Sequence, residues 1–210
     1  MHAIVEEQFA PLLARRGGDL VADFSDVVPA RTICTIIGIP DAEAPRVIDL
    51  VAGTGALLDG VTDPDGMVTA MGRAGELYTF VADQLGRALE RVPGERSGLL
   101  AVLGEGISNG TFTVNDVHSV LLTLVSAGSD TTASLLATAT ERLARDQDLQ
   151  SALRREPARL PDAIDDILRD AGPFQFHYRY VPHDTVLGEV AIPAHSRVMV
   201  MWAAANLSDS

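Results

Sequence analysis

Hydrophobic residues recur at helical spacing through most of the first 170 positions. This spacing, closed at intervals by Gly or Pro, predicts a series of helices. The expected helices cover residues 3–16, 19–39, 41–58, 67–92, 113–145, 146–155 and 160–169. Pro29 is expected to break the second helix, and Leu99–Leu103 is interpreted as a short apolar turn. The pattern therefore predicts a helical body over residues 1–172.

The hydrophobic period changes after Gly172-Pro173. Short runs rich in β-branched and aromatic residues follow, separated by further Pro and Gly, and they predict strands. These runs cover residues 178–181, 185–187, 190–192 and 197–201. Helices first and a small sheet last predict a mostly α chain with a small β tail, of the α+β class. We expect residues 173–210 to form part of this small sheet and residues 1–210 to form a single domain.

The longest predicted helix opens with Thr113-Val114-Asn115-Asp116, a capping-box pattern with Asp in place of the usual Glu. Its stretch from Val117 to Thr140 has Asp130 as its only full charge and is long enough to cross a bilayer. Ser, Thr and Gly interrupt the stretch, and no basic flank orients it. The pattern therefore favours a helix buried through the centre of a globular protein over a membrane span.

Charge and cysteine content restrict the expected partners and compartment. The chain has 16 basic and 29 acidic residues, so the formal net charge is −13. Most of the surface should therefore repel nucleic acid. Cys34 is the single cysteine, which excludes an intramolecular disulfide and fits a reducing cytoplasm. The first residues lack the order of a signal peptide, and the five scattered histidines fit no zinc spacing. We expect a cytoplasmic protein without nucleic-acid or membrane partners.

The long helix carries an unusual polar stretch, Ala127-Gly128-Ser129-Asp130-Thr131-Thr132. Gly costs about 1 kcal/mol relative to Ala inside a helix, so Gly128 is expected to have a compensating role. Without a side chain it lets a planar group or a small ligand approach the backbone. Thr131 can donate its hydroxyl to the Ala127 carbonyl and open a local groove, and Asp130 is costly on a buried helix unless it has a partner or relays protons. Spacing alone leaves close helix packing open as a second interpretation.

This stretch resembles the central helix of the cytochrome P450 family, whose motif is a small residue, Gly, any residue, Asp or Glu, and then Thr followed by Thr or Ser. The resemblance implies a helix that crosses the distal face of a heme. Carried over residue by residue, Ala127 and Gly128 match the oxygen-binding groove that contacts the cofactor. Asp130 matches the acid and Thr131 the catalytic alcohol of the pair that delivers protons during dioxygen activation.

Two later segments resemble the same family. Asp166 and Arg169 lie one helical turn apart, like the Glu and Arg of the family's Glu-x-x-Arg helix, which implies a buried charge network with Asp in place of Glu. Arg179 matches the strand Arg that binds a heme propionate. From the residues alone, the first is a common surface pair and the second an exposed strand Arg. The resemblance covers nearly all of the chain, from the helix before Gly38-Ile39-Pro40 to Ser210.

The resemblance implies a heme-dependent monooxygenase that inserts one atom of dioxygen into a small apolar organic substrate. It also implies heme b as the cofactor and a ferredoxin-type electron donor. The family's Phe-x-x-Gly loop, which carries the cysteine ligand, does not occur in these 210 residues. Cys34 lies in an apolar run and is expected to be a small buried hydrophobe. We therefore expect an incomplete P450 fold and an inactive chain.

Two other interpretations of the chain stay open at this point. One is a heme-free homologue that binds or activates another enzyme, and the other is a fragment of a longer gene product. The intact Asp130-Thr131 pair favours the fragment, because a dedicated scaffold has no chemical use for an acid beside an alcohol.

Overall fold

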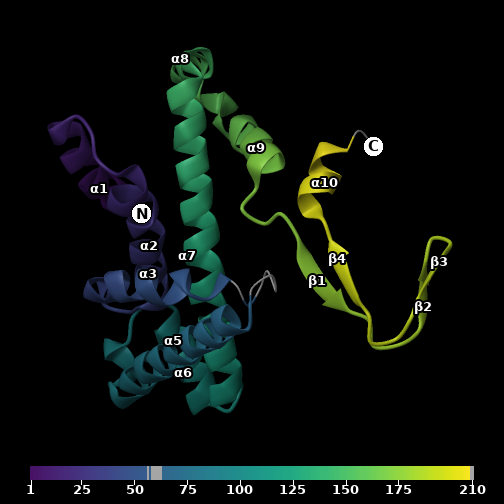
Figure 1. Ribbon diagram of the computed structural model, residues 1–210. Coiled ribbons are helices and arrows are strands. Elements are labelled where there is room, and N and C mark those ends of the chain that lie inside the picture. The colour runs from purple at the N-terminus through teal and green to yellow at the C-terminus, as the bar shows by residue number, and fades with distance from the viewer. Residues whose placement is uncertain (56, 58–62, 209–210) are drawn as a thin grey trace.

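The computed structural model describes residues 1–55, 57 and 63–208. A helical body surrounds one long helix, and an arm of short strands extends away from it (Figure 1). The helices of the body are α1 (His2–Arg15), α2 (Val27–Ile37), α3 (Ala44–Ala52), α5 (Pro64–Glu90), α6 (Gly98–Ser108), α7 (Val114–Arg145), α8 (Gln147–Arg155) and α9 (Leu160–Ala171). Short turns of other helix types are η1 (Val21–Ser25), η2 (Asp41–Glu43), η3 (Pro93–Glu95) and η4 (Pro157–Arg159). The arm contains β1 (His177–Tyr180), β2 (Thr185–Leu187), β3 (Val190–Ile192), β4 (Arg197–Val200) and α10 (Trp202–Leu207).

The predicted capping box begins the central helix α7. The Thr113 hydroxyl accepts a hydrogen bond from the Asp116 backbone N–H at 3.1 Å, and the Asp116 carboxylate accepts one from the Thr113 N–H at 3.0 Å. Two backbone N–H groups that have no partner inside the helix are thereby satisfied. The helix then runs unbroken for 32 residues. The prediction of one long helix at this position is confirmed.

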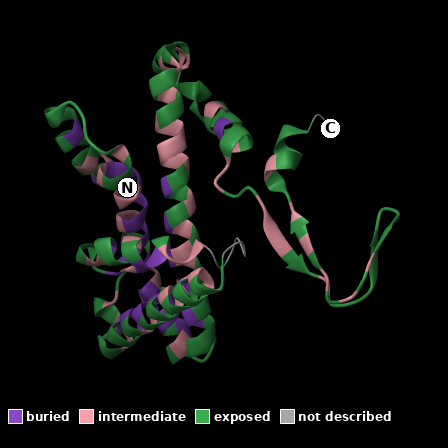
Figure 2. Ribbon diagram, in the orientation of Figure 1, coloured by how far each residue is buried: buried purple, intermediate pink, exposed green. Residues whose placement is uncertain are grey.

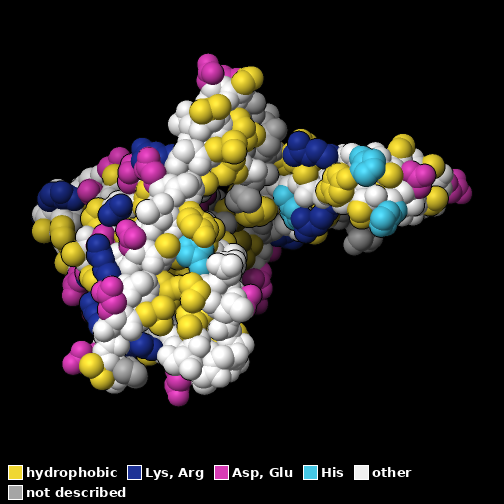
Figure 3. Space-filling model, turned by 90° about the horizontal axis from the view of Figure 1, so that it is seen from below, with side chains coloured by type: hydrophobic (Ala, Val, Ile, Leu, Met, Phe, Trp, Pro, Cys, Tyr) yellow, Lys and Arg dark blue, Asp and Glu magenta, His cyan; other side chains and the backbone are white. Residues whose placement is uncertain are grey.

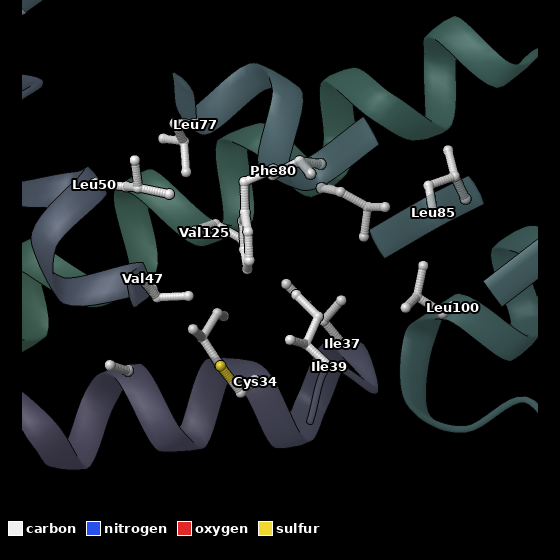
Figure 4. Packing of buried hydrophobic residues seen from close by; sticks show 14 of the residues in the cluster. Cys34, Ile37, Ile39, Val47, Leu50, Leu77, Phe80, Leu85, Leu100 and Val125 are labelled. Atoms are coloured by element: carbon white, nitrogen blue, oxygen red, sulfur yellow. The ribbon is translucent and has the colours of Figure 1, made fainter. Parts of the chain in front are cut away.

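The main core lies where α2, α3, α5 and α6 pack around the N-terminal half of α7. In Figure 4, side chains from these helices converge on a common interior, among them Cys34, Ile37, Val47, Leu50, Leu77, Phe80 and Val125. A smaller cluster of Ile4, Leu12, Phe24 and Val28 joins α1 to the start of α2. Burial of these apolar surfaces is the main favourable contribution to folding.

Burial along α7 is uneven, which corrects the prediction that the whole helix is buried. Leu121 and Val125 are buried, whereas Leu135 and Leu136 are only partly covered. Figure 2 shows the change along the helix, from buried residues beside the body to intermediate and exposed ones beyond it. Among the described helices, α7 alone is long and apolar enough to cross a membrane. Its packing against α2, α3, α5 and α9 favours a core helix instead.

Pro29 does not break the second predicted helix. The break comes earlier, where the π-helical turn η1 ends at Ser25 and α2 begins at Val27. Pro29 lies in the first turn of α2, where backbone N–H groups have no partner within the helix in any case. The predicted break within residues 19–39 therefore exists, but it lies at Asp26 and not at Pro29.

Two further predictions about the first 110 residues need correction. Leu99–Leu103, interpreted as a turn, belongs to the 11-residue helix α6, because Leu100 and Leu103 bury one face of it in the core. Asp41 does not cap α3: its carboxylate accepts a hydrogen bond from Arg31 Nε at 2.8 Å, and the α-helix starts at Ala44. The predicted extension of that helix to residue 58 lies partly outside the described residues.

The arm consists of two separate two-stranded antiparallel sheets. In the first, β1 pairs with β4, and His177 lies opposite Val200. In the second, β2 and β3 form a hairpin that turns at Gly188, whose φ of 61° favours glycine. Most residues of the arm are exposed, and Figure 3 shows hydrophobic and histidine side chains over its surface. The mostly α chain with a β tail is confirmed, although the tail is not one continuous sheet.

Candidate functional site

The polar stretch of α7 lies where the helix leaves the core. Ser129 and Ala133 are buried, whereas Asp130 is exposed and Thr131 is half-buried. The Thr131 hydroxyl donates to the Ala127 carbonyl at 2.6 Å. This is the local bond predicted from the spacing, and it draws the hydroxyl against the helix, where Ser and Thr side chains compete with the backbone ladder.

Gly128 has a packing role in this structure. A Cβ atom built on it would lie 3.2 Å from Cδ1 of Ile33, on α2. Because Gly128 has no side chain, α2 and α7 can approach closely. This packing compensates for the cost of a glycine inside the helix. α2 occupies the space on the side of α7 where the Cβ of Gly128 would lie. A ligand at Gly128 would therefore have to approach the helix from another side. Ala127 is exposed, and its side chain is only a methyl group.

A pocket of about 480 Å³ lies beside the Asp130-Thr131 pair. Its walls come from α7 and from the segment that joins α9 to β1, and the lining residues include Asp130, Thr131, Ser134, Thr138, Gln175, Phe174 and Phe176. Gly172 allows that segment to turn tightly, since a Cβ there would meet the Leu168 carbonyl oxygen at 2.6 Å. The acid and the alcohol thus both line a pocket whose walls mix hydroxyl, amide and aromatic groups.

Asp166 and Arg169 form an ion pair at the surface of α9, with 3.3 Å between Oδ1 and Nη2. Their side chains are 75% and 56% exposed, so neither is buried. The buried charge network that the resemblance implies is therefore not seen among the described residues. α9 does pack against α7, and an exposed ion pair between Arg142 and Asp170 at 3.2 Å joins the two helices. Helical spacing could not predict that second pair, because Arg142 and Asp170 lie 28 positions apart.

Arg179 lies on β1 with an exposed guanidinium group. Its Nη1 atom lies 3.5 Å from the carbonyl oxygen of the neighbouring Tyr178. No acid among the described residues forms an ion pair with it. On the same sheet, the Arg197 guanidinium lies 4.3 Å from the centre of the Tyr178 ring. An exposed arginine without an acidic partner is available to bind an anionic group.

Cys34 is fully buried in the main core, as predicted. Burial raises the pKa of its thiol to about 11, and the negative charges of Asp41 and Glu43 act in the same direction. The thiol therefore stays protonated at neutral pH. A protonated, buried thiol does not fit the role of an iron ligand, because metals bind the thiolate.

Similar proteins were found by sequence. The chain is 31% identical over 179 residues to cytochrome P450 144 of Mycobacterium tuberculosis, covering 85% of this chain and 41% of that protein. It is 29% identical over 212 residues to 6-deoxyerythronolide B hydroxylase of Saccharopolyspora erythraea, covering 98% of this chain and 50% of that protein. No family model matches the chain. The chain spans about half the length of the curated relatives it matches.

Solved structures give the same result. CalO2 matches with a TM-score of 0.83 and 25% identity, over 98% of this chain and 51% of its own. The P450 monooxygenase TamI, solved with tirandamycin C, matches with a TM-score of 0.77 and 27% identity, over 97% and 48%. Cytochrome P450 CREJ, at 24% identity, shares the fold with a TM-score of 0.88. By sequence and by fold, the chain is similar to cytochrome P450 proteins and corresponds to about half of their length.

Proposed function

We propose that this chain supplies the distal helix and the acid–alcohol pair of a heme-dependent monooxygenase. The observation that carries the proposal is the pocket of about 480 Å³ into which Asp130 and Thr131 both face, on a helix whose motif matches the family. Titratable groups that converge on a pocket of this size are the usual mark of an active site.

The side chains around the pocket have separate roles in this proposal. Asp130 lines the pocket and can pass a proton into it. Thr131 lies beside it, with its hydroxyl held on the Ala127 carbonyl at 2.6 Å, and it orients the proton donor. Phe174 and Phe176 offer apolar contact to an organic substrate. The substrate class proposed is a small apolar organic molecule.

The residues on this side fit a planar cofactor in part. At Ala127 only a methyl group covers the exposed side of α7, so a flat ring can approach the helix there. Arg179 is an exposed cation that suits a propionate. Cys34, buried in the core, does not supply the thiolate ligand. When bound, heme b supplies dioxygen activation and oxygen insertion, and a ferredoxin-type protein is the electron donor proposed.

A chimera tests the proposal. Residues 1–210 replace the matching half of 6-deoxyerythronolide B hydroxylase, and heme content and hydroxylated product are measured. The chimera is expected to bind heme, and Thr131→Ala is expected to keep the heme while product per electron falls roughly tenfold or more. Thr132→Ala, a neighbouring exposed threonine, is the control. A chimera with a native far-UV circular dichroism spectrum and no heme contradicts the proposal and favours a heme-free binding partner.

The isolated chain gives a second test. Residues 1–210 are mixed with heme, reduced and exposed to carbon monoxide, and the absorption spectrum is recorded. We expect no thiolate-type Soret band, because Cys34 is the only thiol and it is buried and protonated. Such a band, lost again in Cys34→Ala, would show that the core opens and that Cys34 binds iron.

A further inference from the structure

A second, smaller pocket shares the Asp130 side chain with the first. Its volume is about 200 Å³, and it lies between the start of α2, helix α3 and helix α7. Its polar lining comes from Asp26, Ser129 and Asp130, and Ile48, Val51 and Ala133 contribute apolar walls. Because Asp130 lines both pockets, it forms the wall between them.

Ser129 indicates what the small pocket holds. Ser129 is 95% buried, given a relative exposure of 5%, and its hydroxyl has no hydrogen-bond partner among the residues that the structure describes. A buried hydroxyl without a partner costs about 1–3 kcal/mol, so a ligand that accepts or donates a hydrogen bond is expected there. Water occupies about 30 Å³ in the liquid, and a pocket of about 200 Å³ has room for several molecules. Two carboxylates and a hydroxyl give those waters the polar partners they need.

Asp26 is brought to this pocket by an irregular stretch of backbone. Its N–H donates to the Val21 carbonyl at 3.0 Å, the i→i−5 bond of the π turn η1. A π turn holds an extra residue and so changes which side chains face the neighbouring helix, and such turns are frequent at functional sites. The Asp26 carboxylate does not cap α2, which leaves it available to the pocket.

The two charged groups that shift the pKa of Asp26 are both negative. Burial raises its pKa first, and the carboxylates of Asp130 on α7 and Asp19 before η1 raise it further. The nearby arginines are engaged elsewhere: Arg15 of α1 pairs with Asp23 at 2.7 Å, and Arg31 of α2 pairs with Glu7 and Asp41 at 3.0 and 2.8 Å. Arg46 of α3 lies over the Phe80 ring. Asp26 therefore holds its proton to a higher pH than an ordinary aspartate does.

We propose that Asp26 is the proton-relay residue that feeds Asp130, through water hydrogen-bonded to Ser129 in the small pocket. The proposal rests on the proposed function of the Asp130-Thr131 pair. Protonated Asp26 gives its proton to a pocket water, that water gives one of its own protons to the Asp130 carboxylate, and bulk solvent reprotonates Asp26. The net result is one proton moved from solvent to Asp130, with no change in oxidation state.

The first experiment needs no heme. The Asp26 carboxyl is titrated by ¹³C NMR in residues 1–210 and in the Asp130→Asn and Ser129→Ala variants. Asp130→Asn is expected to lower the pKa of Asp26, because it removes a neighbouring negative charge. Asp83→Asn, an exposed carboxylate on α5, is the control and should leave that pKa unchanged. An Asp26 pKa that is the same in wild type and Asp130→Asn overturns the coupling.

The second experiment tests the relay in the heme-containing chimera. Asp26→Asn is expected to lower product per electron roughly tenfold and to enlarge the solvent deuterium isotope effect, while Asp26→Glu restores the yield and Asp83→Asn changes neither. Thermal melts check that Asp26→Asn folds. A folded Asp26→Asn with wild-type yield and isotope effect overturns the relay. If the wild-type chimera does not bind heme, the proposed function is contradicted instead. The NMR titration then still tests the coupling between Asp26 and Asp130.

Discussion

At the scale of single residues, the closest approaches in this structure explain the residue types found there. Gly128 lies against Ile33 of α2, with 3.2 Å between the Cβ it lacks and the Ile33 methyl carbon. Gly72, by contrast, has no atom within 4 Å of the corresponding position on α5. Both glycines lie inside helices, but of the two only Gly128 has a close neighbour. Substitutions at the two positions therefore distinguish the effect of helix propensity from the effect of packing.

Replacing each of these glycines with alanine is expected to give different results. Gly72→Ala should stabilise the chain by about 0.5–1 kcal/mol, because it removes the conformational cost of glycine without a new contact. Gly128→Ala should gain the same stabilisation but lose part of it, because the added methyl group lies close to Ile33. Gly128→Leu should destabilise by about 1–3 kcal/mol through overpacking. Urea unfolding of the three variants measures the differences. Equal stabilisation by both alanine substitutions would show that α2 yields without cost.

Cys34 is expected to make stability depend on pH in the alkaline range. The unfolded thiol loses its proton near its ordinary pKa of 9.0, whereas the folded thiol holds it to about 11. Between these values the unfolded state binds fewer protons, so stability falls as pH rises, by about 3 kcal/mol in all. Urea unfolding at pH 8 and pH 10.5 measures the loss, and Cys34→Ala should show a smaller one. A variant with the wild-type pH dependence would assign the effect to other groups.

At the scale of secondary structure, α7 depends on its cap and on its two unlike halves. The first half packs into the core, and the second half carries the Asp130-Thr131 pair and contacts α9. The hydrogen bonds between Thr113 and Asp116 fix where the helix starts, and so they fix which side chains face the core. The Thr113 hydroxyl also donates to the Asp116 carboxylate at 2.7 Å. This bond first, and then the one from the Thr113 backbone N–H, lowers the pKa of Asp116.

Removal of the cap should therefore weaken the fold in a pH-dependent way. Thr113→Ala is expected to cost about 1 kcal/mol at neutral pH. The depressed pKa of Asp116 means that its contribution is present above the ordinary value of 3.8 and is lost as pH falls below it. Thermal unfolding at pH 7 and pH 3 measures both effects, with Thr111→Ala as a control outside the cap. A deficit in Thr113→Ala that persists undiminished at pH 3 would contradict this account.

At the scale of the whole molecule, the arm leaves much apolar surface uncovered. The exposed large hydrophobic residues of the arm include Val186, Leu187, Val190, Met199, Met201 and Trp202. Contiguous apolar surface of this kind is uncommon in stable monomers and marks an interaction surface. The hairpin of β2 and β3 contributes three of these residues and extends away from the helical body in Figure 1.

The isolated chain is therefore expected to associate in solution. Leu187→Lys together with Val190→Lys should lower the apparent mass at a given concentration, because charge at the hairpin opposes apolar contact. Analytical ultracentrifugation measures the mass. Asp83→Lys on α5 is the control for an added positive charge away from the hairpin. A wild-type chain that sediments as a monomer at high concentration contradicts the expectation.

The sequence by itself determined the helices, the capping box, the change of period near residue 173 and the Thr131–Ala127 bond. These depend on neighbours within about four residues, whose chemistry can be read directly from the order of the chain. Only the tertiary structure decided that Gly128 faces Ile33, that Arg142 pairs with Asp170, and that Asp26 shares a pocket with Asp130. Each of these depends on which elements lie against one another. One-dimensional patterns do not specify that, because an apolar stripe identifies a buried face without naming what covers it.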